Sequence, residues 1–194
     1  PLPCKIAVLV AKFLNIPSLL LLHVGMIGPK YDCPSFLVDK LAVPGEYARD
    51  ILIKCGVDRK RLVVTGRPAY DALVRAEEQF KKDEICGKLG LDPTRKIIVH
   101  TTENLPLRES EAMVRAICKG VREFSDSQFI IKVHPSELAL SMYERVIKDI
   151  GLNALITRDA NIYEVLYICD VMITGFSATA LDAMILDRPV ITVN

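Results

Sequence analysis

Short apolar runs alternate with longer amphipathic stretches along the chain from Val43 onward. The short runs are rich in Val and Ile and are bounded by polar, Gly or Pro residues, as strands are. The longer stretches repeat apolar residues every three or four positions, as Met113, Ile117 and Val121 do, which is typical of a helix with one buried face. Strands that alternate with helices in this way predict an α/β domain with a doubly wound parallel sheet.

The expected elements follow this pattern in order. We expect strands over Leu62–Thr65, Lys96–His100, Phe129–Val133, Ala154–Ile156, Val171–Thr174 and Val190–Val193. Between them we expect helices over Ala69–Lys82, Glu109–Phe124, Glu137–Ile150, Ile162–Ile168 and Ala178–Leu186.

The first part of the chain has a separate pattern. It predicts a helix over Ile6–Leu14 and strands over Pro17–His23 and Asp39–Val43. These elements are too few for a domain, so we expect residues 1–44 to close an N-terminal Rossmann-like domain and residues 45–194 to form a second domain. We expect both ends of the chain to be cut, since it starts at Pro1 and stops after a strand.

Composition narrows the class of protein. A chain of 194 residues with 51% hydrophobic and 25% charged residues forms one to one and a half globular domains. Its net charge of +1 argues against a nucleic-acid partner, which needs a basic excess. The six cysteines form no CxxC pair, which predicts reduced thiols in a cytoplasmic protein. The apolar run Ile16–Val24 contains a Pro and is shorter than the roughly 20 residues of a membrane helix.

The strongest local motif lies within Val171–Val193. Gly175 permits a tight turn after the strand, and Ser177 is placed to cap the helix that follows. The amides of residues 178–180 would then lack intrahelical partners and form a phosphate site at the helix N-terminus.

Side chains of the same motif extend this site. The hydroxyls of Ser177 and Thr179 could bond phosphate oxygens, and the carboxylate of Asp182 could accept hydrogen bonds from a ribose. An ordinary capped helix with an exposed Asp182 fits the motif equally well.

A second motif is Phe129–Glu137, in which His134 and Pro135 follow an apolar strand. Ligands of open α/β sheets gather outside the carboxyl ends of the strands, where an imidazole can hold a phosphate or transfer a proton. A structural His134 is the alternative, and Lys132 is interpreted as a solvated flank.

A second histidine-containing segment supports the interpretation of the first. His100 ends another strand and is followed by a polar loop that contains Glu103. Two histidines at the ends of two parallel strands would face one crevice, so His100 and His134 are the candidate catalytic residues and Glu103 lies near them. We expect no metal and no cofactor, because spacing places no third metal ligand.

Two further residues are candidates for the cleft between domains. His23 ends the first apolar strand before a loop with Gly25 and Gly28. Arg67 lies between Gly66 and Pro68 and could meet an anionic group, while Asp71 is interpreted as structural.

These motifs, in their order, resemble the GT-B superfamily. The resemblance rests on AKFLNIPSLLLLHVG, DKLAVPGEYARDILIKCGVDRKRLVVTGRPAYDAL, KVHPSE and NIYEVLYICDVMITGFSATALDAMILDRPVITV. It is strongest to the branch that holds non-hydrolysing UDP-N-acetylglucosamine 2-epimerases, CDP-glycerol glycerophosphotransferases and capsule-polysaccharide transferases.

The resemblance implies two Rossmann-like domains, the second of which binds a nucleotide-sugar. Ser177, Ala178 and Thr179 match the family's diphosphate-binding turn, and Asp182 matches a ribose-binding Glu. His134 and Pro135 match the His-Pro motif that the transferases use around the donor phosphates.

Two departures weaken the epimerase interpretation. The epimerases carry His-Arg-Arg-Glu-Asn where this chain has His100-Thr101-Thr102-Glu103-Asn104, and a Gly-Gly pair where it has Ala178-Thr179.

The leading hypothesis is a transferase that moves a sugar or polyol-phosphate group from a UDP- or CDP-linked donor to a glycan or lipid-linked acceptor. An epimerase and a non-catalytic nucleotide-sugar-binding module are the alternatives. Peripheral membrane contact and oligomeric state are left open by the sequence, and a fragment alone is expected to be inactive.

Overall fold

A computed structural model describes the backbone of residues 2–22, 37–137 and 140–193. The chain divides into two compact units, Pro1–Asp71 and Ala72–Asn194. Within the described residues, no helix is long and apolar enough to cross a membrane.

The first unit is built on a small parallel sheet. Its strands are ordered β1-β2-β3, and Leu41, Val43 and Leu52 are almost fully buried in its core. The elements are α1 (Leu2–Phe13), β1 (Leu19–Leu21), β2 (Lys40–Val43), α2 (Glu46–Lys54), a 3-10 turn (Arg59–Arg61) and β3 (Leu62–Val64).

This unit extends further along the chain than the sequence predicted. The strand expected over Leu62–Thr65 was assigned to the second sheet, but β3 pairs with β2. The pairing keeps Leu62 in the core of the first unit, with Leu52 of the unforeseen helix α2. The division between units therefore lies at Asp71, later than the boundary expected at residue 44.

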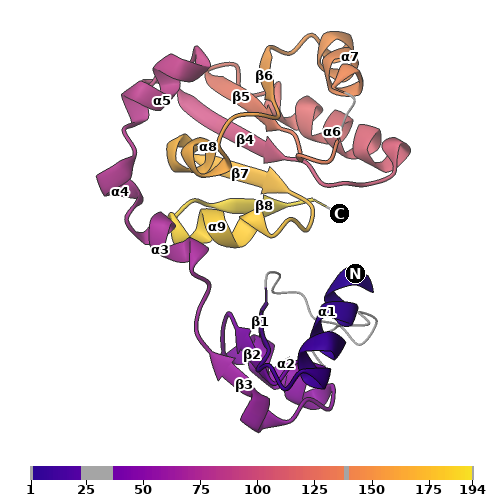
Figure 1. Ribbon diagram of the computed structural model, residues 1–194. Coiled ribbons are helices and arrows are strands. Elements are labelled where there is room, and N and C mark those ends of the chain that lie inside the picture. The colour runs from indigo at the N-terminus through magenta and orange to yellow at the C-terminus, as the bar shows by residue number, and fades with distance from the viewer. Residues whose placement is uncertain (1, 23–36, 138–139, 194) are drawn as a thin grey trace. The chain divides into compact units, whose positions relative to one another are not determined.

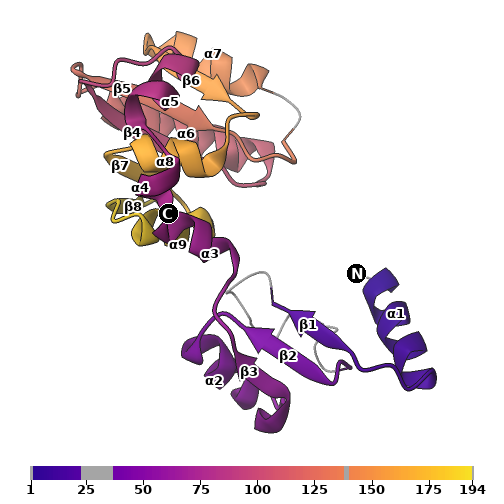
Figure 2. The same ribbon diagram turned by 60° about the vertical axis from the view of Figure 1, so that its left-hand side comes forward.

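The second unit contains a five-stranded parallel sheet with the order β6-β5-β4-β7-β8. Helices α6 and α7 cover one face, and α5, α8 and α9 cover the other (Figure 1; Figure 2 shows the same layers turned). The expected doubly wound α/β fold is confirmed. The strands are β4 (Lys96–Thr101), β5 (Ser127–Lys132), β6 (Ala154–Thr157), β7 (Val171–Thr174) and β8 (Val190–Thr192), and the helices are α5 (Lys82–Leu89), α6 (Leu107–Val121), α7 (Ser141–Ile150), α8 (Ile162–Ile168) and α9 (Thr179–Ile185).

The strand order also fixes where a ligand belongs. The chain runs outward from β4 through β5 to β6, returns to β7 beside β4, and continues to β8. The direction of winding thus reverses between β4 and β7. In open α/β sheets, ligands bind outside the carboxyl ends of the strands at this switch point.

The long helix expected over Ala69–Lys82 is divided into α3 (Ala69–Val74), α4 (Ala76–Gln79) and the start of α5. Phe80 leaves the helical conformation, with φ −111° and ψ 142°. Its ring packs at 5.6 Å from that of Tyr167 on α8. Tertiary packing of Phe80 thus overrides the local helical pattern.

Four cysteines of the described residues are free: Cys86, Cys118 and Cys169 are buried, and Cys55 is half-buried. Burial raises the pKa of the Cys118 thiol to about 11 and that of Cys169 to about 12, so both stay protonated at neutral pH.

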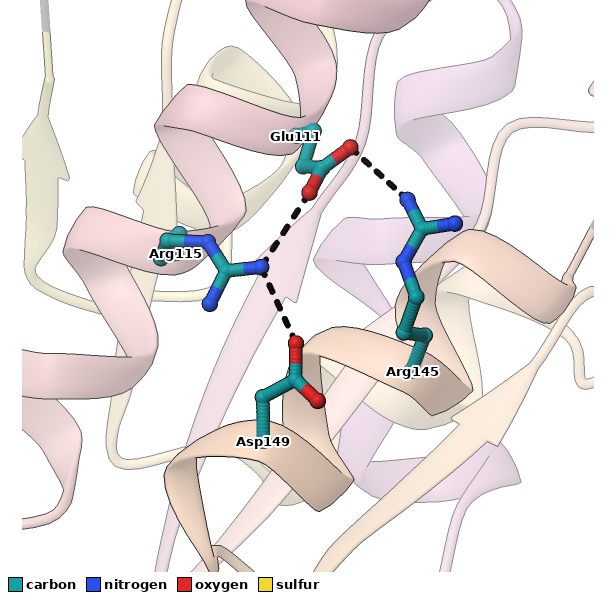
Figure 3. A network of polar contacts seen from close by, with 4 residues as sticks. All are labelled: Glu111, Arg115, Arg145 and Asp149. Atoms are coloured by element: carbon teal, nitrogen blue, oxygen red, sulfur yellow. Dashed lines mark hydrogen bonds and ion pairs between the residues drawn. The ribbon is translucent and has the colours of Figure 1, made fainter.

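Helices α6 and α7 are joined by ion pairs over an apolar contact. Arg115 bonds both Glu111 and Asp149, and Arg145 bonds the other oxygen of Glu111 at 2.8 Å (Figure 3). The exposed fractions of these side chains run from 31% to 57%, so solvent screens their charges. Below them, Ile117 and Val146 are almost fully buried.

We expect the apolar layer to dominate the stability of this helix pair. Ile117→Ala should lower the free energy of unfolding by about 2–5 kcal/mol, because it leaves a cavity. Glu111→Gln should cost no more than about 1 kcal/mol, since exposed ion pairs contribute little. Urea denaturation measures both, and an equal loss in the two variants would contradict this assignment.

Candidate functional site

Each strand of the second sheet ends on a threonine or a lysine. Thr101 of β4 pairs with Lys132 of β5, and Lys132 pairs with Thr157 of β6. Thr174 of β7 pairs with Thr192 of β8, and the Thr101 hydroxyl bonds that of Thr174 at 3.1 Å. Residues paired in a parallel sheet point to the same face. The five side chains therefore form a polar row across the carboxyl ends of the sheet.

A hollow of about 500 Å³ lies beyond this row. It brings together His134 and Pro135 with the turn Ser177–Thr179, as the sequence predicted. Glu103, Lys132 and Arg158 line it as well. The hollow therefore contains hydroxyls, an imidazole and two cationic side chains at the switch point between β4 and β7.

The carboxylate of Glu103 holds the turn after β7. Its Oε1 accepts hydrogen bonds from the Thr174 hydroxyl at 2.6 Å and from the backbone amides of Gly175, Phe176 and Ser177 at 2.9, 3.0 and 3.1 Å. The Glu103 side chain lies in the loop after β4 and is 8% exposed. One internal anion thus joins the ends of the two strands that flank the switch point.

Gly175 is required by this contact. A Cβ atom at position 175 would lie 2.7 Å from Glu103 Oε2 and 3.1 Å from the methyl group of Met113. The sequence explained Gly175 by a tight turn, whereas the close approach of a carboxylate is the constraint that the structure shows.

Four hydroxyls form a chain that ends on the same carboxylate. Thr174 donates to Glu103, and Thr101 donates to Thr174. Because each hydroxyl has one proton, Thr179 must donate in its 3.2 Å contact with Thr101, and Ser177 must donate in its 2.8 Å contact with Thr179. Ser177 is thus the outermost donor and the one that a ligand can redirect.

The backbone amides are less available than the sequence predicted. The Thr179 amide donates to Ser177 Oγ at 3.3 Å, and the Ala180 amide donates to the Ser177 carbonyl at 3.1 Å. Helix α9 begins at Thr179 and has only seven residues. In the described part of the chain, the amide of Ala178 is the one between positions 175 and 180 without a hydrogen-bond partner.

A second carboxylate, that of Glu137, fixes the turn that carries His134. It accepts hydrogen bonds from the hydroxyls of Thr102 and Tyr143. Thr102 also accepts the backbone amide of His134 at 2.9 Å. Helix α7 begins at Ser141, later than the start at Glu137 that the sequence predicted.

The imidazole of His134 has a defined tautomer. Its Nδ1 accepts the backbone amide of Ser136 at 3.2 Å and contacts the Ser136 hydroxyl at 2.6 Å. A nitrogen that accepts an amide carries no proton, so Nε2 holds the proton of the neutral ring. The exposed His134 therefore offers an N–H donor at the hollow.

His100 lies elsewhere. It precedes Thr101 and faces the opposite side of the sheet, where it is 2% exposed beside a cavity of about 10 Å³. Its Nδ1 lies 3.0 Å from the Ile173 carbonyl. Burial lowers the pKa of His100, against the opposing effects of this hydrogen bond and of nearby glutamates. The expected shared crevice thus contains His134 without His100, because neighbouring residues of a strand point to opposite faces.

The remaining candidates have different outcomes. Asp182 is 5% exposed on α9 and does not line the hollow. Arg67 lies in the first unit, with its guanidinium over the ring of Tyr70 at 5.1 Å. His23 lies outside the described residues.

Lys132 corrects an expectation. It was interpreted as a solvated flank, yet it is 6% exposed and donates to the carbonyls of Val133 and Arg158 at 3.1 and 2.7 Å. Arg158, which the sequence did not indicate, lines the same hollow. The recurrence of Thr or Lys at the last position of each strand is the signal that could have identified this row.

The family of CDP-glycerol:poly(glycerophosphate) glycerophosphotransferases matches residues 31–194. Comparison with curated protein sequences gives no match.

Several solved structures share the fold. UDP-GlcNAc 2-epimerase from Neisseria meningitidis bound to UDP-GlcNAc has a TM-score of 0.74 and 16% identity over 98% of this chain and 56% of that one. The UDP-GlcNAc 2-epimerase from Methanocaldococcus jannaschii has a TM-score of 0.69 and 17% identity over 97% of this chain and 57% of that one. The wall teichoic acid polymerase TagF, in a variant soaked with CDPG, has a TM-score of 0.59 and 26% identity over 81% of this chain and 40% of that one. The chain thus spans about half the length of these proteins.

We expect Gly175→Ala to destabilise the turn after β7. The new methyl group would displace Glu103 from the amides, at a cost of about 1–3 kcal/mol for overpacking. Hydrogen exchange at residues 175–177 should accelerate as the amides lose their acceptor. Gly120→Ala is the matched control, because a Cβ there has no neighbour within 4 Å. Unchanged exchange in Gly175→Ala would contradict the role of Glu103.

Proposed function

The chain belongs to the CDP-glycerol:poly(glycerophosphate) glycerophosphotransferase family, and we propose that its second unit binds the donor of a transferase reaction. The transferred group is a polyol phosphate or a sugar, carried by a CDP- or UDP-linked donor to a glycan or lipid-linked acceptor. The observation that carries this proposal is the hollow at the switch point, where Ser177, His134 and Lys132 converge.

The contacts of the hollow suit a diphosphate. Ser177 can turn its hydroxyl from Thr179 to a phosphate oxygen, and the free amide of Ala178 lies beside it. Thr179 then supports Ser177 through the hydroxyl chain. Asp182 is 5% exposed and does not line the hollow, so a ribose contact would need α9 to move.

His134 is proposed to act on the leaving group. With CDP-glycerol, transfer of glycerol phosphate breaks the phosphoanhydride bond and releases CMP, whose phosphate gains negative charge in the transition state. The Nε2–H of His134 can donate to that charge, because Nδ1 is already occupied by Ser136. His100 is assigned no role in this step, since it faces away from the hollow.

The first unit is proposed to end the preceding domain of a larger protein. Its helix and first strand leave apolar side chains exposed, with Phe13 at 86% and Leu19 at 68%. An acceptor site that includes His23 or Arg67 would belong to that domain. A cytoplasmic location remains a proposal that rests on the unpaired cysteines.

The epimerase alternative has weaker support. The epimerase structures are 16–17% identical to this chain, which indicates a common fold. Thr101 at the end of β4 and Thr102 after it stand where the epimerases have paired arginines, and both threonines are engaged in internal hydrogen bonds.

The two enzyme classes differ in their need for an acceptor. We expect the full-length protein to release CMP from CDP-glycerol when poly(glycerophosphate) is added, and to leave UDP-N-acetylglucosamine unchanged when it is the sole substrate. Nuclear magnetic resonance of the sugar region follows the second reaction. Epimerised UDP-N-acetylglucosamine would overturn the transferase proposal, and donor binding without turnover would favour a binding module.

Variants of the hollow should separate binding from turnover. Ser177→Ala should weaken donor binding roughly tenfold, as expected for one hydrogen bond to a charged group. His134→Ala should lower kcat about 100- to 1,000-fold with little change in donor affinity, because its contact strengthens in the transition state.

The control for both variants is Ser125→Ala. Ser125 is exposed near the opposite end of the sheet and should affect neither quantity. Calorimetry and steady-state kinetics supply the measurements. Wild-type behaviour of both Ser177→Ala and His134→Ala would remove the support for this site.

A further inference from the structure

The polar row at the carboxyl ends of the second sheet contains one charged member. Thr101, Thr157, Thr174 and Thr192 are neutral, and Lys132 lies between the first two of them. The lysine side chain is 6% exposed, and it lines the hollow together with Ser177 and His134. A nearly buried ammonium at this position is an unusual feature, because lysine is almost never buried without a partner.

The partners of Lys132 are neutral. Its Nζ donates to the carbonyls of Val133 and Arg158, and it forms no salt bridge within the described residues. An ammonium has three N–H groups, so two carbonyls leave one donor for another ligand. Asp159 is the acidic residue whose charge acts on Lys132, but its side chain is 92% exposed and lies 3.6 Å from the guanidinium of Arg158.

The amides that might otherwise hold an anion are already engaged. Glu103 takes those of residues 175–177, and Ser177 takes those of Thr179 and Ala180. The hollow therefore has one free amide, that of Ala178, and a nearly buried ammonium that forms no salt bridge within the described residues. A diphosphate would supply the missing negative charge.

We propose that Lys132 is the principal positive contact of the donor diphosphate in this hollow. This inference rests on the proposed function, and it deepens it by naming the residue that recognises the diphosphate. Arg158 is a second and more exposed cation at the same rim. Lys132 would contact the diphosphate and not the base, because its neighbours in the polar row are threonine hydroxyls.

The surroundings of Lys132 also predict a pH dependence. The charged and titratable groups around it are Glu103 after β4, His134 after β5, and Arg158 and Asp159 after β6, while the turn after β7 contributes hydroxyls. Burial lowers the pKa of Lys132, and the charge of Asp159 opposes this effect. The ammonium should therefore lose its proton below the ordinary lysine pKa of about 10.4. Diphosphate binding should weaken over the same pH range.

The test compares CDP with cytidine as calorimetric ligands of the full chain. Lys132→Met removes the charge and keeps the length of the side chain. We expect it to weaken CDP binding by tenfold or more and cytidine binding by less than twofold. Lys96→Met is the matched control, because Lys96 is 78% exposed at the start of β4 and pairs with Asp170. It should leave both affinities unchanged.

Several outcomes would overturn the inference. An unchanged CDP affinity in a folded Lys132→Met variant would overturn it. An equal loss of affinity for CDP and for cytidine would also overturn it, because it would indicate a purely structural lysine. If circular dichroism shows that Lys132→Met is unfolded, the wild-type pH profile decides. The inference is supported if CDP affinity decreases as the pH rises toward the ordinary lysine pKa while cytidine affinity stays constant. A CDP affinity that does not change with pH in this range refutes it. If the wild type binds cytidine, CDP and UDP equally or not at all, the proposed donor site itself fails.

Discussion

The second unit depends on a buried carboxylate at the point where the sheet changes its direction of winding. Four donors converge on Glu103 Oε1, and all of them come from the last residue of β7 and the turn that follows it. Hydrogen bonds to a charged group contribute about 1.5–3 kcal/mol each. Without this anion, three partly or fully buried amides would lack an acceptor, and the turn would be held to the end of β4 only by the hydroxyl contacts of Thr101. The site is therefore shaped by an internal anion before any ligand arrives.

That arrangement changes which force attracts a phosphate. The motif around Ser177 suggested backbone amides at a helix N-terminus, which contribute about 0.3–1 kcal/mol at exposed sites. Helix α9 is short, and its neighbouring amides are bonded internally. Two unit charges 4 Å apart interact by about 4 kcal/mol at the effective dielectric constant typical near a protein surface. A nearly buried lysine is thus a stronger source of attraction, even though the chain as a whole has a net charge of only +1.

Hydrophobic periodicity predicted the fold class well. The alternation of strands and helices located β4 to β8, because buried parallel strands need continuous apolar runs. It could not assign β3 to the first sheet, since pairing with β2 depends on contacts between residues far apart in sequence. The candidate site was also predicted only in part. The sequence located His134 and Ser177 after the ends of two strands. It could not give the face of the sheet to which His100 points, because successive residues of a strand point to opposite faces and one residue decides the outcome. The burial of Lys132 and Asp182 likewise depends on neighbouring elements and not on local sequence.

The loop after β4 links the two halves of the hollow. Thr102 joins Glu137 and the backbone of His134, while its neighbour Glu103 holds the turn before Ser177. Two adjacent residues thus fix the backbone of His134 on one side and that of Ser177 on the other. Polar groups aligned before the reaction need no reorganisation when charge develops, which is the source of most electrostatic stabilisation in active sites. The cost is visible in the same loop: Glu103 Oε2 is buried without a hydrogen-bond partner in the described part of the chain. A buried polar atom without a partner destabilises a fold. Its retention beside the hollow fits a site in which alignment of the polar groups outweighs local stability.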